Sequence, residues 1–235
     1  MVELDALVVE ALLVLETLLL IATLILIYKS REEYRSRLEL LENMKIAIEV
    51  LSRREYFDSV IELYRVAREW VVATVTGNRP PESERHMIED LLDLIGERVK
   101  EGIEIRLIMP KAPDKLYMGY RYNTIGVKVK YHENIQVYDL RYSVADGRTV
   151  VMGFPLEIGE AKPTRRGVKI NSEILAGILE SNFNSLWDSS DAITYDEYLS
   201  MYVNGVLKTH PELTLESLSK QLGIPLEELE RVVAR

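Results

Sequence analysis

The sequence contains no cysteine, and this absence excludes disulfide frameworks, thiolate metal sites and a cysteine nucleophile. It has only three histidines, His86, His132 and His210, which lie far apart and show no metal-ligand spacing such as H-x-x-x-H. We therefore expect no metal and no other cofactor. Basic residues are too few for a generally basic nucleic-acid binder, because 29 Lys and Arg stand against 38 Asp and Glu, a net charge of −9.

A long apolar run occupies the N-terminus. Residues 6–28, ALVVEALLVLETLLLIATLILIY, are apolar on every face of a helix. Such a helix would span roughly 34 Å, enough for a hydrocarbon core of about 30 Å. Glu16 lies deep in this run, so it would have to be protonated or to face another helix. We predict a transmembrane anchor over residues 1–28, and the alternative is a long buried helix of a soluble bundle.

The charges around this run predict its orientation. Four basic residues follow it closely, namely Lys29, Arg31, Arg35 and Arg37, whereas the segment before it is acidic. The positive-inside rule then places the N-terminus outside and the main domain in the cytoplasm. The acidic N-terminus and the lack of a small-residue cleavage site argue against a cleaved signal peptide. We expect a single-pass protein of the cell membrane.

Residues 29–55 contain no glycine or proline and predict a linker helix. Its apolar residues fit the a and d positions of a heptad, but Arg37 and Glu55 interrupt the repeat. The fitting residues are Tyr34, Leu41, Met44, Ile48 and Leu51. Two clean heptads allow two interpretations: a short parallel coiled coil that forms a dimer stalk, or one amphipathic helix packed on its own domain.

Residues 56–190 have the pattern of an α/β domain. Helical periodicity at 56–69 and 82–100 alternates with strand-like runs at 70–75 and 103–109, which favours parallel strands in a covered sheet. Strand-like runs follow at 127–131, 137–144 and 148–154, with a hairpin signal at Asp146-Gly147. A polar loop, GEAKPTRRG, leads to a helix over 171–187. We predict the α/β class, with helices on both faces of the sheet.

One stretch of this domain resembles a known motif. Residues 139–154, DLRYSVADGRTVVMGF, resemble the signature of the phospholipase D-like superfamily, H-x-K-x-x-x-x-D followed after six residues by G-S. The flanks SVIELYRVAREWVVATV and GVKINSEILAGILESNFNSLW also look like that module, which is similar to modules in archaeal sugar-sensing-type transcription regulators. The resemblance covers residues 56–190. It implies a phospholipase D-like sheet and, because that fold pairs two units, a homodimer.

The motif is degenerate at the positions that carry its chemistry. Asp146 and Gly153 match it, but Asp139 replaces the nucleophilic His, Arg141 the Lys and Phe154 the Ser. The resemblance implies that the His would attack phosphorus, and a carboxylate there would repel an anionic phosphodiester. We therefore expect no catalytic residues. Asp139, Arg141 and Asp146 form either a structural ion pair or a remnant anion pocket.

Two further groups are candidate contacts for a ligand. The loop residues Lys162, Arg165 and Arg166 either contact lipid headgroups or a phosphate, or are simply solvated. The segment KLYMGYRYN places Tyr117, Tyr120, Arg121 and Tyr122 either over a sheet edge or against a base or sugar.

Residues 191–235 predict a small module of three helices. The order of a helix, a turn at LSKQLGIP and a second helix resembles a helix-turn-helix. Thr214 is a suitable N-cap, although Ser217 in place of Glu predicts an incomplete capping box. The last helix, PLEELERVVAR, is rich in acid, which disfavours DNA and favours a protein partner.

These observations lead to one preferred function and two alternatives. We expect a membrane-anchored, catalytically degenerate phospholipase D-like protein that binds a ligand or partner in the cytoplasm as a regulatory module. The first alternative is a membrane-tethered transcription regulator that binds DNA through its C-terminal helices. The second is an active phosphodiesterase that uses unconventional residues.

Overall fold

The computed structural model describes residues 29, 48–135, 140–154 and 166–234. No helix within these ranges is long and apolar enough to cross a membrane. The predicted anchor at 6–28 and the first part of the predicted linker helix lie outside them.

The described elements alternate between strands and helices. In chain order they are β1 (Ile48–Ser52), α2 (Arg53–Val66), β2 (Trp70–Thr74), η1 (Glu82–Glu84), α3 (Arg85–Lys100), β3 (Glu104–Pro110), η2 (Pro113–Lys115), α4 (Leu116–Thr124), β4 (Lys128–His132), β5 (Arg141–Ala145), β6 (Thr149–Phe154), β7 (Arg166–Asn171), α5 (Glu173–Trp187), β8 (Ile193–Thr194), α6 (Tyr195–Thr209), α7 (Leu215–Leu222) and α8 (Leu226–Val233).

The strands form one sheet in the order β1-β7-β6-β5-β2-β3-β4-β8. β2, β3 and β4 are parallel neighbours, as the alternation of helix and strand predicts. The other pairings are antiparallel, so β2 lies where the parallel and antiparallel halves of the sheet meet. In open α/β sheets, ligands bind in the crevice outside the carboxyl ends of the parallel strands.

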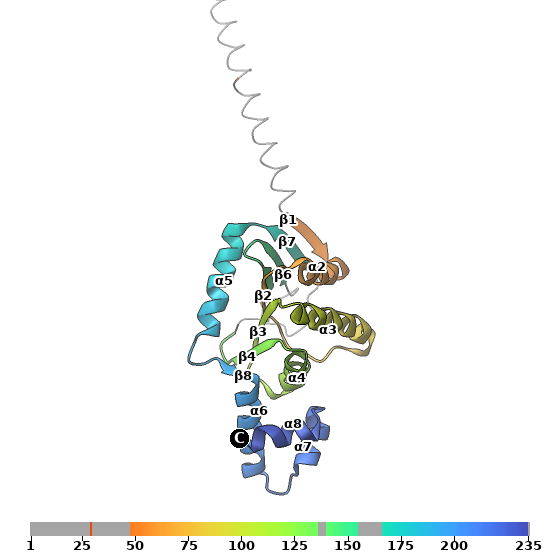
Figure 1. The fold of residues 1–235 in the computed structure, drawn as a ribbon, viewed down its shortest axis with the longest axis vertical. Helices are drawn as coiled ribbons and strands as arrows, with labels where there is room; N and C mark the ends of the chain where they lie inside the picture. Colours follow the sequence, from red (N-terminus) through yellow and green to blue (C-terminus); the bar gives the residue numbers. More distant parts are fainter. Residues whose placement is uncertain (1–28, 30–47, 136–139, 155–165, 235) are drawn as a thin grey trace, which may run out of the picture. The chain divides into compact units, whose positions relative to one another are not determined.

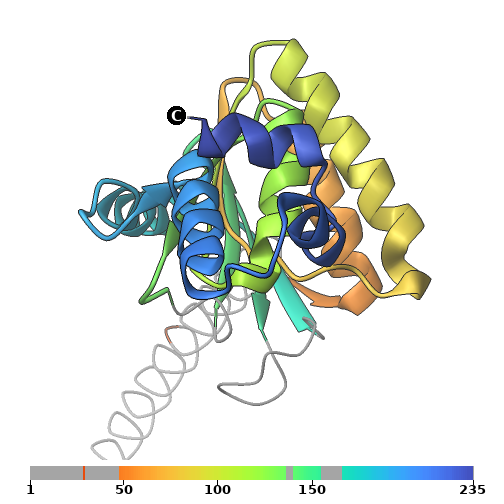
Figure 2. The ribbon, with the colours of Figure 1, turned by 90° about the horizontal axis from the view of Figure 1, so that it is seen from below.

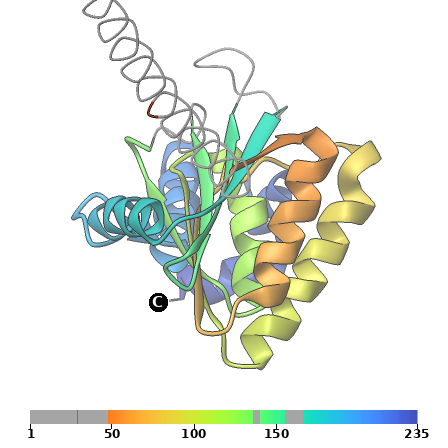
Figure 3. The same cartoon turned by 90° about the horizontal axis from the view of Figure 1, so that it is seen from above.

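Helices cover both faces of the sheet, as predicted (Figures 1 and 3). α2, α3 and α4 pack on one face, over the larger hydrophobic core, and α5 packs on the other face over a smaller core. The smaller core is centred on Phe183 and Val144, both fully buried. The fold is therefore α/β.

The hairpin predicted at Asp146-Gly147 joins β5 to β6. Both residues have positive φ, 50° and 63°, and with Arg148 they form a three-residue turn in which the Arg148 N–H donates to the Ala145 carbonyl at 3.1 Å. Ala145 pairs with Thr149 at the base of the turn.

The predicted linker helix is wrong at its C-terminal end. Residues Ile48–Ser52 form the edge strand β1, which pairs antiparallel with β7. Ile48 and Leu51, assigned above to heptad positions, therefore belong to a strand; Leu51 is buried in the core. The following helix begins separately, because Ser52 and Glu55 form a complete capping box.

Two further elements differ from the sequence prediction. The last two residues of the predicted polar loop, Arg166 and Gly167, begin strand β7, which pairs with β6 and β1. The tyrosine-rich segment after β3 forms the short helix α4. Both are short elements whose formation depends on partners elsewhere in the chain.

The C-terminal helices α6, α7 and α8 form as predicted and lie beside α4 (Figure 2). Their buried residues Leu218 and Leu229 belong to the same core as Leu116 and Tyr131 of the α/β part, so the core is continuous across residue 190. The capping box at Thr214 is complete, contrary to expectation, because the Ser217 hydroxyl accepts from the Thr214 N–H at 3.1 Å.

Candidate functional site

A cavity of about 220 Å³ opens at the carboxyl end of β2, on the face covered by α2, α3 and α4. Its lining combines aromatic and apolar side chains of α2, α3 and α4 with polar groups of β5 and of the loop that follows β2. The lining includes Tyr56, Phe57, Val60, Tyr64, Asn78, Arg79, Glu84, Ile88, Met118, Tyr122, Arg141 and Ser143. Its position agrees with the expected binding edge of an open α/β sheet.

The two-residue period of β5 directs Arg141 and Ser143 to this face. Ala145, two residues further on, belongs to the core under α2, and side chains at i and i+2 share one face of a strand. Arg141 is only 8% exposed. Because a guanidinium keeps its proton in proteins, Arg141 brings a permanent positive charge to the wall of the cavity.

Two buried tyrosines, Tyr64 and Tyr122, also line the cavity. Burial raises the pKa of Tyr64 strongly, with a smaller contribution from Tyr122, while its neighbour Ser143 opposes the shift by hydrogen bonding. Burial also raises the pKa of Tyr122, to about 12. Both hydroxyls therefore stay neutral at physiological pH and offer hydrogen bonds to a ligand without adding negative charge.

The loop after β2 is fixed from three sides. Val75 donates its N–H to the carbonyl of Ile108 at 3.0 Å. Gly77 has φ +63°, and a Cβ at this position would lie 2.7 Å from the Sδ of Met109. The Nζ of the buried Lys115 donates to the side-chain oxygen of Asn78. This loop thus presents a defined rim to the cavity.

Asp146, the best match to the resembled motif, lies away from this cavity. Its carboxylate accepts hydrogen bonds from the backbone N–H groups of Arg68, Glu69 and Trp70 at 2.8, 3.0 and 3.0 Å. Arg141 and Asp146 are at opposite ends of β5, roughly 16 Å apart at strand geometry. The structure does not bring these two predicted site residues together.

The remaining motif positions have structural surroundings. Gly153 is buried between Arg141 of β5 and Gly167 of β7 in the sheet. Phe154 ends β6, where it pairs with the exposed Arg166. Asp139, Lys162 and Arg165 lie outside the described residues. Of the predicted ligand contacts that the structure describes, Arg141 and Tyr122 line the cavity.

None of the three histidines lines the cavity. His86 is exposed on α3, where its Nδ1 lies 3.2 Å from Asp90. His132 is buried at the end of β4, and its Nδ1 accepts from the N–H of Asn134 at 3.0 Å. His210 follows α6 and is exposed. Within the described ranges no group of three or more His, Asp or Glu side chains could hold a metal ion.

The tyrosine-rich segment forms α4, and its side chains pack against protein groups. Tyr122 lines the cavity, and Tyr117 lies under the guanidinium of Arg79, 4.4 Å from its ring centroid. Arg121 pairs with Glu89 of α3, its Nη1 lying 3.0 Å from Oε1.

Sequence reasoning did not identify α2 as a wall of the cavity. The only local sequence signal among the lining residues is the turn GNRPP, which forms the rim after β2.

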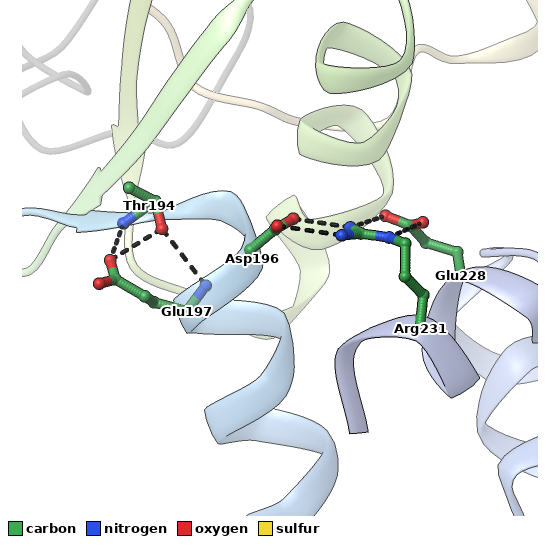
Figure 4. A network of polar contacts seen from close by, with 5 residues as sticks. All are labelled: Thr194, Asp196, Glu197, Glu228 and Arg231. Atoms are coloured by element: carbon green, nitrogen blue, oxygen red, sulfur yellow. Dashed lines mark hydrogen bonds and ion pairs between the residues drawn. The ribbon is translucent and has the colours of Figure 1, made fainter. Parts of the chain in front are cut away.

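The outer face of the last helix is acidic. Glu227 and Glu230 of α8 are exposed. Arg231 donates to both oxygens of Asp196 at 2.7 and 3.0 Å and to both oxygens of Glu228 at 2.8 Å (Figure 4). This network ties α8 to the start of α6 and occupies the Arg231 guanidinium.

Comparisons with known proteins find likeness in structure but not in sequence. No protein-family model matches the chain, and no curated protein matches it. Nuc from Salmonella typhimurium, a phospholipase D family member, aligns with 14% identity and a TM-score of 0.49, over 63% of this chain and 97% of Nuc. NucT from Helicobacter pylori aligns with 13% identity and a TM-score of 0.48, over 63% and 98%.

An archaeal protein is also similar. TrmBL2, described as an archaeal chromatin protein with a novel mode of DNA binding, aligns with 16% identity and a TM-score of 0.45. The alignment covers 68% of this chain and 62% of TrmBL2. At these sequence identities the similarity is one of backbone fold, and it assigns no activity to this chain.

Proposed function

We propose that this chain is a membrane-anchored, catalytically degenerate phospholipase D-like protein whose α/β domain binds a small anionic ligand as a regulatory module. The observation that carries the proposal is the position of Arg141 in a cavity lined mainly by tyrosine and apolar side chains. Such a cavity neutralises an anion through Arg141 and accommodates an apolar or aromatic body beside it.

The lining favours binding over hydrolysis. The resembled family forms its phospho-enzyme on a histidine, and the described lining residues include no histidine. Tyr64 and Tyr122 are protonated at neutral pH, as phenols are, and burial raises the pKa of each hydroxyl further. Asp146, which a motif-based mechanism would use, is bonded to three backbone N–H groups at the other end of β5.

The test uses the full chain in mild detergent with inorganic pyrophosphate as the probe. We expect pyrophosphate to raise the melting temperature of the wild type and of Arg148→Met, an exposed arginine in the β5–β6 turn that serves as the matched control. Arg141→Met should lose the shift relative to its own ligand-free baseline, and Arg141→Lys should retain part of it.

Two outcomes would contradict the proposal. One is a shift that is the same in Arg141→Met as in the wild type. The other is turnover of bis(p-nitrophenyl) phosphate by the wild type that Arg141→Met abolishes, because it would establish the phosphodiesterase alternative.

The anchor and the homodimer belong to the same proposal and rest on the sequence pattern of residues 1–47 and on the resemblance. We expect the protein to remain in the membrane fraction after lysis without detergent and to run as a dimer in detergent. Recovery of the protein in the soluble fraction would refute the anchor. A monomer by light scattering would refute the homodimer.

A further inference from the structure

We propose that Arg79 couples the occupancy of the cavity to the packing of the helix pair α7–α8. This inference rests on the proposed function in one respect: the natural ligand would act on Arg79 from the same cavity. An anion at the cavity rim would draw the Arg79 guanidinium away from the end of α7 and so loosen that helix.

Arg79 contacts both regions at once. It follows β2 in the loop at the rim and contributes to the lining of the cavity. Its Nη2 donates to the carbonyl oxygen of Leu222, the last residue of α7. Its guanidinium also lies over the ring of Tyr117 in α4, 4.4 Å from the centroid. The side chain thus spans from the rim to the C-terminal helices.

The end of α7 is shaped for this contact. Gly223 terminates the helix in the left-handed conformation, with φ +69°. The positive φ favours glycine at this position, and a Cβ there would lie 3.2 Å from the Nη2 of Arg79, so a larger residue would displace the guanidinium by a few tenths of an ångström. The last carbonyls of a helix have no partner within it and carry partial negative charge, which a guanidinium satisfies and neutralises.

The surroundings restrict where a response can occur. Gly77 and Asn78 hold the backbone of the loop against Met109 and Lys115, so the flexible part of this connection is the Arg79 side chain. The cavity and the Leu222 carbonyl therefore compete for one guanidinium. A ligand in the cavity shifts the Arg79 guanidinium away from Leu222 only if it binds more tightly when the guanidinium is released. An anion does so, because a charge-assisted hydrogen bond to the guanidinium is stronger than one between neutral groups.

The experiment exploits the lack of cysteine in the chain. Thr76, a half-buried residue of the rim, is replaced by cysteine in the full chain in mild detergent. The thiol is then modified either with the anionic 2-sulfonatoethyl methanethiosulfonate or with the neutral methyl methanethiosulfonate. Amide hydrogen exchange of residues 219–223 is compared with that of unmodified Thr76→Cys.

We expect the sulfonate to accelerate exchange in the last turn of α7 about tenfold, the effect of losing one charge-assisted bond. The neutral methyl group should leave exchange unchanged. Arg79→Met should accelerate exchange without any label and make the sulfonate ineffective, whereas Arg79→Lys should show an intermediate rate. Arg85→Met is the matched control, because Arg85 lies in the same region but pairs with Glu82.

Two results would overturn the inference: a sulfonate that leaves α7 exchange unchanged, and a sulfonate effect of equal size in Arg79→Met. The labels are covalent, so the outcome does not depend on pyrophosphate binding. A failure of the coupling is therefore distinguishable from a failure of the proposed function.

Discussion

Asp146 and Trp70 are joined by a reciprocal pair of hydrogen bonds. The N–H of Asp146 donates to the carbonyl of Trp70 at 3.2 Å, and the Oδ1 of Asp146 accepts from the N–H of Trp70 at 3.0 Å. The same carboxylate accepts from Arg68 and Glu69, so the β5–β6 turn holds the junction of α2 and β2. The aspartate that matches the resembled motif thus stabilises the fold in this chain.

Removal of this carboxylate should destabilise the protein. Asp146→Ala leaves three backbone N–H groups without their charged acceptor, and we expect a loss of roughly 2–4 kcal/mol in the free energy of unfolding. Asp146→Asn should lose less, since an amide oxygen still accepts and Asn tolerates positive φ. Urea denaturation of each variant measures the loss. The exposed Asp93→Ala in α3 is the control, and equal stability of Asp146→Ala and Asp93→Ala would contradict the assignment.

The sequence predicted the elements whose signals are local. The helical periodicity of α3 and the Asp146-Gly147 turn each lie within one short segment, and the structure confirms them. The segment at Ile48–Ser52 fits both a heptad and a strand, and its pairing with β7 decides between them. The cavity was not predictable from local patterns. Its walls come from α2, α4 and β5, which only the folded topology brings together.

Gly77 should tolerate no side chain. Its φ of +63° costs an alanine about 1–2 kcal/mol, and the contact with the Sδ of Met109 adds to that cost. We expect Gly77→Ala to lower the free energy of unfolding by roughly 2–3 kcal/mol. Gly177→Ala is the matched control, because no atom lies within 4 Å of its Cβ position in α5, and it should stabilise by about 0.5–1 kcal/mol. Equal effects of the two variants would exclude this explanation.

The ion pair between Glu89 and Arg121 should make stability depend on pH. The hydrogen bond from Arg121 lowers the pKa of the Glu89 carboxyl below its ordinary value of 4.5. A group with a lowered folded pKa contributes its stability above the unfolded value and loses it as the pH falls through the folded value. The wild type should therefore exceed Glu89→Gln by roughly 0.5–1 kcal/mol at pH 7, a small difference because the pair is partly exposed.

The difference in free energy of unfolding between the wild type and Glu89→Gln should shrink as the pH falls below 4.5 and vanish below the folded pKa of Glu89. Urea denaturation at each pH measures it. A difference that persists unchanged at pH 3 would show that the charge of Glu89 is not its source. Glu97→Gln, an exposed change on the same helix, provides the baseline for a carboxylate without this partner.

The C-terminal helices should bind no DNA in the native chain, although α7, Gly223 and α8 follow one another as in a helix-turn-helix. Glu227 and Glu230 face solvent on α8, and Arg231 is held by Asp196 and Glu228. Phosphate neutralisation drives DNA affinity, so this surface repels the duplex. We expect the full chain in detergent to give no mobility shift of duplex DNA at low salt.

The double variant Glu227→Lys, Glu230→Lys tests whether charge is the obstacle. It leaves the Arg231 network intact and should gain weak, sequence-independent binding whose logarithm falls with log salt, with a slope of at most about −2 for two phosphates. A salt-dependent shift by the wild type would instead establish the DNA-binding alternative. Failure of the double variant to bind would mean that the geometry of α8, and not its charge, prevents access to DNA.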